Sequence, residues 1–501
     1  MNFSFISVFK KKNKAGIKKD SPPFRLFNSL SKMKEVFESL KPNVARMYSC
    51  GPTVYDTAHI GNLRSYIFSD ILRRTLEYNN YKVKHVINIT DVGHLTSDED
   101  SGDDKMMVAL KREGVPITLS EMKKIGSKYI KEFKEDLKKL NIKTPFIFPR
   151  ASEHIDVQIA FIKTLEEKGY TYTLKDGVYF DTKMFKDYGV LGGISKEDIK
   201  TISRIGKNKD KHNQQDFALW KFSTTKTPAG KELGWKSPWG VGFPGWHIEC
   251  SAMSSQYLGK QFDIHTGGFD HVAIHHNNEI AQTEAVTGKK FVNYWMHNAF
   301  ITVESKRIGK SEGNAIYLRH LIDRGFPAFA YRYWLLTGHY RSPMNFTWEA
   351  LEGANTALIK LHKQFLDLGP KNGKIDASYQ ARFHTFINDD LNTPKALALL
   401  HELMGDELIE KKDKRITILD MNRVLGIGFI ESYRQMKTIF AGETKKIEVK
   451  KAPDDVQELV KEREQARKGR DWETADSIRN KIEERGFDIS DTDVGPELTK
   501  K

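Results

Sequence analysis

The chain has 501 residues, of which 39% are hydrophobic and 29% charged, a composition typical of a globular protein with several domains. It contains no run of about eighteen apolar residues, which excludes a helical membrane span. Cys50 and Cys250 are its two cysteines, so a disulfide scaffold is excluded and a reducing compartment, the cytoplasm, is expected. A formal net charge of +14 favours a polyanionic partner such as nucleic acid.

Residues 1–22 are rich in lysine and contain one acidic residue, Asp20. We expect a disordered basic arm that assists the binding of a polyanion. An organellar targeting segment is the alternative, but the stretch lacks arginine, and its apolar part is too short for a secretion signal.

Helical and strand-like segments alternate between residues 46 and 95. Ser69–Tyr78 has a helical pattern and Val83–Ile89 is a short β-branched run, which is typical of a parallel sheet with helices on its faces. Thr118-Leu-Ser-Glu121 is typical of a helix start. The helix that follows has lysines on one side and an apolar face, which we expect to pack on the sheet. The apolar residues are Ile125, Tyr129, Phe133, Leu137 and Leu140.

Residues 141–215 differ from their surroundings, with strand candidates at Gly169–Thr173 and Gly177–Asp181 and a polar, lysine-rich loop near 204–214. We interpret them as an insertion between two halves of the sheet domain.

From about residue 350 the pattern is helical to the end of the chain. Asn392-Thr393-Pro394 predicts a helix start with proline in the first turn. Asp454–Gly469 and Trp472–Gly486 predict a helical hairpin, in which Gly486 is the C-terminal cap. Ala475, Ile478 and Ile482 share one face of the second helix.

The first cluster of chemically informative residues runs from Cys50 to Asn62. A cysteine ends a strand, a Gly-Pro turn follows, and His59-Ile60-Gly61-Asn62 enters a helix. The backbone N–H groups at such a helix start can bind an anion. Gly61 would allow a nucleotide to approach closely, and His59 and Asn62 could donate to phosphate oxygens. A simply capped turn is the alternative.

Two further clusters contain metal-ligating residue types. One is Pro244–Cys250, and the other is His275-His-Asn-Asn-Glu279, where His275 and Glu279 share a helix face at i, i+4. With Cys50 they form a candidate zinc set of two thiolates, one imidazole and one carboxylate. His265, His271 and His276 are alternative ligands, and the two cysteines could instead be buried apolar side chains.

The fourth cluster is Arg307-Ile-Gly-Lys-Ser-Glu-Gly-Asn314, a basic loop between the strand-like run Phe300–Val303 and a helix. Basic side chains on a glycine-containing loop suit a polyphosphate. A solvated turn is equally compatible with this composition.

The order of these clusters resembles the class I aminoacyl-tRNA synthetases, and among them the cysteinyl-tRNA synthetase family, from about residue 44 onward. His59-Ile60-Gly61-Asn62 resembles the HIGH motif of that family, and Arg307-Ile308-Gly309-Lys310-Ser311 resembles its KMSKS motif. Other similar segments are Asn88–Asp91, Asp216–Trp220, Pro244–Met253, Asp263–Ala285, His339–Pro343 and Asp389–Pro394.

The resemblance implies an α/β fold, in which a Rossmann-like parallel-sheet catalytic domain with an inserted subdomain precedes a mostly α-helical, tRNA-binding C-terminal region. We expect the catalytic halves at 23–140 and 216–315, the inserted connective subdomain at 141–215 and the stem-contact region at 316–360. The basic arm spans 1–22, an anticodon-binding helical bundle 361–450, and a helical hairpin and tail 451–501.

The resemblance also implies the roles of individual residues. Zinc would be held by Cys50, Cys250, His275 and Glu279. Thr90, Trp246 and His265 match the amino-acid pocket. His59, Gly61, Asn62, Lys310 and Ser311 match the ATP site, and the catalytic residues would be His59, Asn62, Arg307 and Lys310.

The implied activity is ATP-dependent ligation of L-cysteine to tRNA-Cys through a cysteinyl-adenylate. Mg2+ would accompany ATP, and zinc would bind the cysteine thiolate, so that serine is rejected without an editing domain. The implied partners are tRNA-Cys, ATP and L-cysteine. We expect a monomer that does not bind a membrane.

The chain departs from the family motifs at several positions. Asn62 replaces the last histidine of HIGH, and in KMSKS Arg307 replaces the first lysine and Gly309 a serine. Glu312 places an acid beside Lys310, and Thr266 and Asn277 also differ from the family pattern. These departures bear on rate and ATP affinity more than on the type of reaction.

Three alternative functions share some of these features. A ligase that joins cysteine to a small amine, of the mycothiol-pathway type, would keep the zinc and ATP motifs but lack a long tRNA-binding region. A non-catalytic tRNA-binding relative would have eroded catalytic motifs. A purely structural zinc protein would need neither ATP motif.

Overall fold

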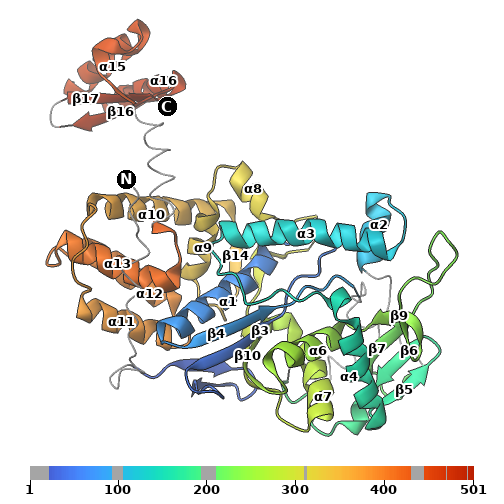
Figure 1. The fold of residues 1–501 in the computed structure, drawn as a ribbon. Helices are drawn as coiled ribbons and strands as arrows, with labels where there is room; N and C mark the ends of the chain where they lie inside the picture. The colour runs from blue at the N-terminus through green and yellow to red at the C-terminus, as the bar shows by residue number, and fades with distance from the viewer. Residues whose placement is uncertain are drawn as a thin grey trace, which may run out of the picture. The chain divides into compact units, whose positions relative to one another are not determined.

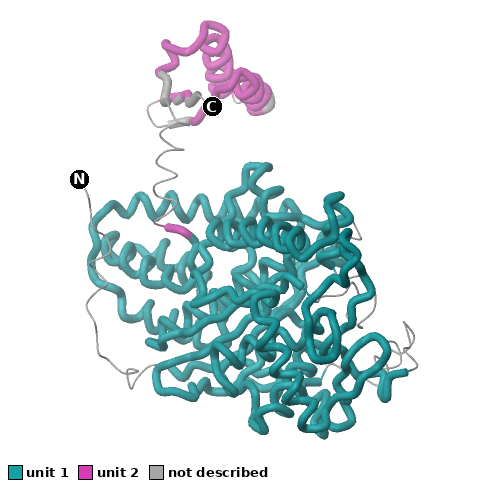
Figure 2. Tube along the Cα trace, turned by 45° about the vertical axis from the view of Figure 1, so that its right-hand side comes forward, with its two compact units in different colours: residues 1–427 teal, residues 428–501 magenta. Residues whose placement is uncertain are grey.

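The computed structural model describes residues 22–92, 105–192, 210–309, 313–429, 445–469, 471–492 and 495–500. The expected basic arm, except for residue 22, therefore lies outside the described residues. The chain divides into two compact units, Met1–Ile427 and Gly428–Lys501 (Figure 2). None of the helices in the described parts has the length and apolar character that crossing a membrane requires.

The core of the first unit is a four-stranded sheet in the order β11-β10-β3-β4, and all its strand pairs are parallel. Because parallel strands point the same way, their carboxyl ends meet at one edge, where ligands bind in open α/β sheets. This confirms the expected Rossmann-like sheet. The strands are β3 (Val44–Ser49), β4 (Lys82–Ile87), β10 (Phe262–Gly268) and β11 (Val292–Asn298).

Helices cover both faces of this sheet, with α1 and α3 on one side in Figure 1 and α6 and α7 on the other. The apolar face expected for α3 is buried, and Thr118 caps the helix by accepting a hydrogen bond from the Glu121 N–H. The helices are α1 (Ile60–Tyr78), α2 (Lys105–Glu113), α3 (Leu119–Lys139), α6 (Trp246–Leu258) and α7 (His275–Thr287).

The insertion between the two halves of the sheet consists of α4 (Ile155–Glu167) and a five-stranded antiparallel sheet in the order β5-β6-β7-β9-β8. Its strands are β5 (Thr171–Leu174), β6 (Gly177–Phe180), β7 (Phe217–Phe222), β8 (Trp235–Ser237) and β9 (Gly240–Pro244). This sheet continues well past residue 215, which is the expected end of the insertion. The pairing of β6 with β7 is long-range, and local sequence patterns do not reveal it.

Short strands and a helical region complete the first unit. Asn392 caps α12 by accepting from the Lys395 N–H, as its sequence predicts. The strands are β1 (Arg25–Asn28), β2 (Met33–Val36), β12 (Ile301–Val303), β13 (Lys306–Arg307) and β14 (Met344–Phe346). The helices are α8 (Leu318–Asp323), α9 (Ala328–Thr337), α10 (Trp348–Asp367), α11 (Ala377–Asn388), α12 (Thr393–Gly405) and α13 (Lys411–Leu425).

The second unit contains the predicted helical hairpin, formed by α15 (Asp454–Lys468) and α16 (Trp472–Glu484). Ala475, Ile478 and Ile482 are buried, and Gly486 has the expected positive φ of 82°. The expectation of helix to the end of the chain is wrong, because a three-stranded antiparallel sheet packs on the hairpin. Its strands are β15 (Lys445–Ile447), β16 (Phe487–Thr492) and β17 (Gly495–Lys500).

Candidate active site

Cys50 begins a tight turn at the carboxyl end of β3. The next residue, Gly51, donates its N–H to Asn88 Oδ1 at 2.7 Å, and a Cβ at this position would lie 1.5 Å from Asn88 O. Only glycine fits so close to the neighbouring chain. Thr90 N–H donates to Pro52 O at 3.1 Å, so the turn is held against the end of β4.

The structure brings the four predicted zinc ligands together at this edge of the sheet. Cys250 comes from α6, and His275 and Glu279 lie one turn apart in α7. One ligand atom from each of these residues and from Cys50 lies within 4.8 Å of every other. The most accessible of the four, Cys50, is only 9% exposed, so the cluster is shielded from water.

The charges in this cluster are set by neighbouring groups. Burial would raise the pKa of Glu279, but the nearby His265 and His275 outweigh it and lower that pKa to about 2. Burial opposes protonation of His275, yet Glu279 raises its pKa to about 10. For Cys250, burial is outweighed by hydrogen bonds with Cys50 and His275, which lower the thiol pKa to about 6. Burial raises the pKa of the Cys50 thiol well above its ordinary value. Without a metal ion the site therefore favours ionised Glu279 and Cys250 beside a protonated His275, which must lose its proton to bind a metal.

The donor set fits a metal ion. Glu279 Oε1 lies 2.9 Å from His275 Nε2, but among the described residues it has no hydrogen bond of acceptable geometry. The nearby protonated His275 supplies positive charge to this buried oxygen, and a metal ion bound to both residues would take over that role. Two sulfurs, one imidazole nitrogen and one carboxylate oxygen are ligands that zinc accepts in tetrahedral sites.

A second set of residues has similar geometry: Cys50, His265, His276 and Glu279 also lie within 4.8 Å of one another. However, His265 Nε2 is 2.8 Å from Glu279 Oε2, and His276 Nδ1 is 2.7 Å from His297 Nε2. These contacts resemble outer-shell support for metal ligands. Because it contains two sulfurs, the set with Cys250 is the better match to zinc.

Of the residues predicted for the amino-acid pocket, Trp246 and His265 contact members of this cluster, and Thr90 contacts Glu249, the residue before Cys250. The half-buried Trp246 ring has its centroid 4.2 Å from that of His275. His265 is fully buried against Glu279. Thr90 is also buried, and its hydroxyl donates to Glu249 Oε2 at 2.8 Å.

The HIGH-like residues form the start of α1. His59 is the N-cap, and its Nδ1 accepts from the Asn62 N–H at 3.2 Å, while Asn62 Oδ1 accepts from the His59 N–H at 3.1 Å. This reciprocal pair is a capping box. Asn62, which departs from the family motif, is therefore part of the cap that fixes this helix start.

The KMSKS-like loop begins beside this helix start. Ile60 N–H donates to Ile316 O at 2.8 Å, and a Cβ on Gly61 would lie 3.2 Å from Ile308 Cγ2. The Asn314 side chain ties the loop ends, donating to Arg307 O at 2.9 Å and accepting from the Gly309 N–H at 3.0 Å. Arg307 is exposed. Lys310, Ser311 and Glu312 lie outside the described residues.

Comparisons with known proteins agree with this geometry. Residues 36–356 match the model of the class I (C) tRNA synthetase catalytic domain. Cysteine--tRNA ligase 1 of Burkholderia lata is 44% identical over 95% of this chain and 97% of its own, and Cysteine--tRNA ligase of Treponema denticola is 43% identical over 93% and 97%. The chain belongs to the cysteinyl-tRNA synthetase family.

Two other parts of the chain match family models too. Residues 382–427 match a DALR domain, and residues 450–495 match the cysteinyl-tRNA ligase anticodon binding domain. The expectation from the sequence places anticodon binding at 361–450 instead. Solved structures share the fold alone, such as the LeuRS of Agrobacterium radiobacter in a complex with tRNA, with a TM-score of 0.57 and 11% identity over 78% of this chain and 84% of that chain.

Within the cysteinyl-tRNA synthetase fold, three residues without a predicted role contact the candidate site. Glu249 is fully buried against Thr90, and His247 Nδ1 lies 2.9 Å from His275 Nδ1. Asn314 holds the KMSKS-like loop. Glu249 and His247 lie inside the Pro244–Cys250 cluster. Their ionisable side chains, close in sequence to the candidate ligand Cys250, are the sequence feature that could have identified them.

Proposed function

We propose that the protein joins L-cysteine to tRNA-Cys with consumption of ATP, through a cysteinyl-adenylate. One observation carries this proposal: two cysteines, a histidine and a glutamate from distant parts of the chain gather within 4.8 Å at the ligand-binding edge of the sheet. The two relatives described above, which are 44% and 43% identical to this chain, are both named as cysteine--tRNA ligases, and this supports the proposal.

Selection of cysteine would depend on the cluster of Cys50, Cys250, His275 and Glu279. A zinc ion held by these residues would supply Lewis acidity, which favours the ionised form of a substrate thiol over a serine hydroxyl. Trp246 would cover the substrate side chain. Thr90 and His265 would act mainly by positioning, because their polar atoms contact Glu249 and Glu279.

ATP would bind at the start of α1. Since His59 Nδ1 accepts a hydrogen bond from Asn62 N–H, the ring proton of neutral His59 is on Nε2 and can be donated to a phosphate oxygen. The Asn62 amide nitrogen can donate in the same way, next to Gly61. Arg307, Lys310 and Ser311 would compensate the charge of the departing pyrophosphate, with Mg2+ bound to ATP.

Catalysis would need no nucleophilic side chain. The cysteine carboxylate attacks the α-phosphate of ATP, pyrophosphate leaves, and a hydroxyl of the terminal tRNA ribose then displaces AMP. The enzyme contributes alignment and charge compensation. We assign anticodon binding to residues 450–495, on the match to the family model, instead of 361–450. We also propose that the enzyme acts as a cytoplasmic monomer.

The test is cysteine-dependent ATP–pyrophosphate exchange by the zinc-loaded protein with Mg-ATP, followed by charging of tRNA-Cys. We expect both activities, with serine inactive in exchange. Absence of exchange would contradict the proposed catalysis and favour a non-catalytic relative. Exchange without charging would instead indicate a ligase that uses a small amine.

A further inference from the structure

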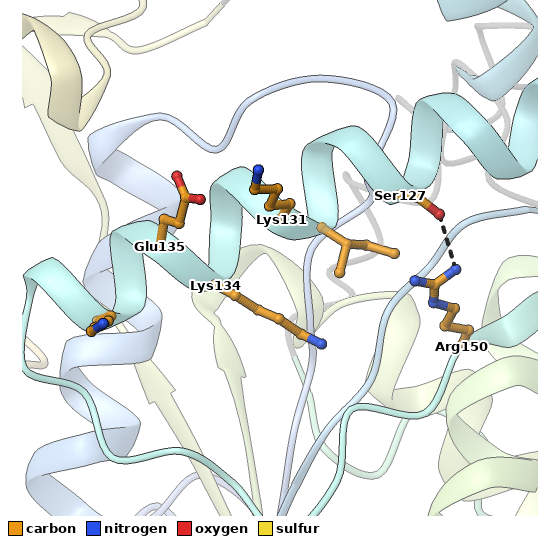
Figure 3. Close-up of a pocket in the computed structure, with 7 residues that line it drawn as sticks. Ser127, Lys131, Lys134, Glu135 and Arg150 are labelled. Carbon is orange, nitrogen blue, oxygen red and sulfur yellow. Dashed lines mark hydrogen bonds between the residues drawn. The ribbon is translucent and has the colours of Figure 1, made fainter.

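Three lysines of α3 and one arginine of a neighbouring segment form a cluster of basic side chains, which we call the α3 basic surface: Lys131, Lys134, Lys138 and Arg150. They line a shallow cavity of about 420 Å³ together with Ser127, Ile130 and Glu135. In Figure 3, Lys134 and Arg150 extend toward the same side of the helix, while Lys131 and Glu135 project from its opposite edge. The three lysines are exposed.

The lysines of this surface are not engaged in ion pairs within the described parts of the chain. By contrast, three other lysines of the same helix pair with acids: Lys124 with Glu121, Lys128 with Glu113 and Lys139 with Asp136. Lys134 Nζ instead lies 4.9 Å from the centre of the Phe148 ring. Arg150 Nη1 donates to Ser127 Oγ at 3.3 Å, which holds its guanidinium against the helix.

The α3 basic surface lies beside the edge of the sheet that carries the candidate site. Arg150 belongs to an extended segment that runs parallel to the end of β4: Ala151 N–H donates to Ile89 O at 3.0 Å, next to Thr90. From the other side of α3, Glu132 Oε2 accepts from the Thr57 hydroxyl at 2.9 Å, in the segment between Cys50 and His59. The surface is therefore linked to two segments that lead to predicted site residues, one next to Thr90 and one between Cys50 and His59.

We propose that the α3 basic surface binds the phosphodiester backbone of the tRNA as its end enters the active site. The proposal rests on the proposed function, because it gives that function's RNA substrate a docking surface. Lys131 to Lys138 extend over about 10 Å of helix. This length exceeds a single phosphate and suits successive phosphates of one strand, and phosphate contacts supply much of the affinity for nucleic acids.

The test measures the affinity of the full-length protein for a transcript of tRNA-Cys at several salt concentrations. The variant is Lys131→Gln/Lys134→Gln/Lys138→Gln. A control with the same loss of charge is Lys163→Gln/Lys289→Gln/Lys290→Gln, which changes exposed lysines of α4 and of the segment after α7. Cysteine-dependent ATP–pyrophosphate exchange is measured for all three proteins.

We expect the α3 variant to reduce the slope of log affinity against log salt by about 2 to 3, since each phosphate contact contributes about 0.7–0.9. Exchange stays unchanged, and the control keeps the wild-type slope. Equal loss of affinity in both variants would overturn the proposal, because general charge and not docking would then be responsible. Loss of exchange in the wild type itself would instead contradict the proposed function.

A gain-of-binding variant gives an independent test. Glu135 is the acidic residue on the rim of the cavity. We expect Glu135→Gln to strengthen binding of the same transcript severalfold at low salt and to leave exchange unchanged. Unchanged or weaker binding by this variant would overturn the proposal.

Discussion

The His275–Glu279 pair shows how buried groups in this site determine one another's charge. Glu279 is fully buried and still ionised, because His265 and His275 hold its pKa at about 2. An isolated carboxylate would be neutral in such a place. Burying these ionisable side chains lowers the free energy of unfolding unless a ligand compensates their charges. Buried groups with shifted pKa values of this kind are typical of functional sites.

Replacing Cys250 with serine tests the ligand set. Because the hydroxyl of serine is a poor zinc ligand, we expect Cys250→Ser to lower the zinc content per protein and the affinity for cysteine together. Zinc is measured by elemental analysis, and cysteine binding by calorimetry. Ser254→Ala, a buried change on the same helix, is the matched control and keeps full zinc.

The same experiment separates the two overlapping ligand sets. His276→Gln removes a member of the alternative set and leaves Cys250 and His275 in place. We expect this variant to retain most of its zinc. Full zinc occupancy in Cys250→Ser combined with zinc loss in His276→Gln would instead identify Cys50, His265, His276 and Glu279 as the ligands.

At the scale of elements, the start of α1 links the HIGH-like and KMSKS-like motifs, which are the predicted ATP site. The reciprocal hydrogen bonds of His59 and Asn62 fix the residue at which the helix begins. Gly61 then lies between the His59 ring and Ile308 of the KMSKS-like loop, where a Cβ would meet these side chains at 3.0 and 3.2 Å. Glycine at this position lets the loop and the helix approach this closely without a shift of either side chain.

Substituting this glycine tests the contact. A Cβ on Gly61 would meet the His59 ring at 3.0 Å and Ile308 at 3.2 Å, so Gly61→Ala must displace one of them. We expect the KM for ATP in pyrophosphate exchange to rise about tenfold, which corresponds to about 1.4 kcal/mol. Unchanged ATP kinetics would show that the contact is not needed for nucleotide binding.

The control for this variant is Gly353→Ala in the middle of α10, where a Cβ meets nothing within 4 Å. Alanine forms helix better than glycine by up to about 1 kcal/mol, so this variant should be slightly more stable. Its ATP kinetics should match those of the wild type.

At the scale of the molecule, a buried ion network joins the catalytic sheet domain to the helical region. Arg332 of α9 is fully buried, and its Nη2 lies 2.6 Å from Asp70 Oδ2 of α1. It also donates to Leu140 O and Leu425 O, at the ends of α3 and α13. This one side chain on α9 therefore ties together α9, α1 and the ends of α3 and α13.

Loss of this side chain should be strongly destabilising. Arg332→Met leaves Asp70 with a single cationic partner and two carbonyls without a donor, so we expect a loss of about 3–5 kcal/mol in the free energy of unfolding. Denaturant unfolding at neutral pH measures it. The control Arg382→Met breaks the exposed pair with Glu402, which water screens, and should cost much less than Arg332→Met.

The pH dependence of this loss in the free energy of unfolding follows from the protonation of Asp70. Burial would raise its pKa, but Arg74 and Arg332 outweigh burial and hold the pKa below its ordinary value of 3.8. A lowered carboxyl pKa stabilises the folded state above that ordinary value, and the stabilisation is lost as the pH falls through the folded-state pKa. In Arg332→Met, Arg74 is the one arginine that still offsets burial, so the pKa of Asp70 should rise in the variant. The cost of Arg332→Met should therefore be at least as large at pH 8 as at pH 5. A cost that grows as the pH falls from 8 to 5 would contradict the lowering of the Asp70 pKa by Arg332.

The sequence by itself determined the features that depend on near neighbours. The Asn392 cap of α12, the hairpin of α15 and α16, and the helical spacing of His275 and Glu279 depend on local propensity and periodicity. The order and residue types of the four clusters indicate the family without any knowledge of tertiary contacts.

The tertiary structure decided what depends on contacts between distant residues. Only the parallel sheet brings Cys50 to Cys250, and only the pairing of Ile60 with Ile316 brings the two ATP motifs together. The extension of the insertion through Pro244 and the sheet of the second unit escaped prediction for the same reason. Such contacts form because folding buries apolar faces and pairs backbone groups across long loops, and neither process leaves a local pattern in the sequence.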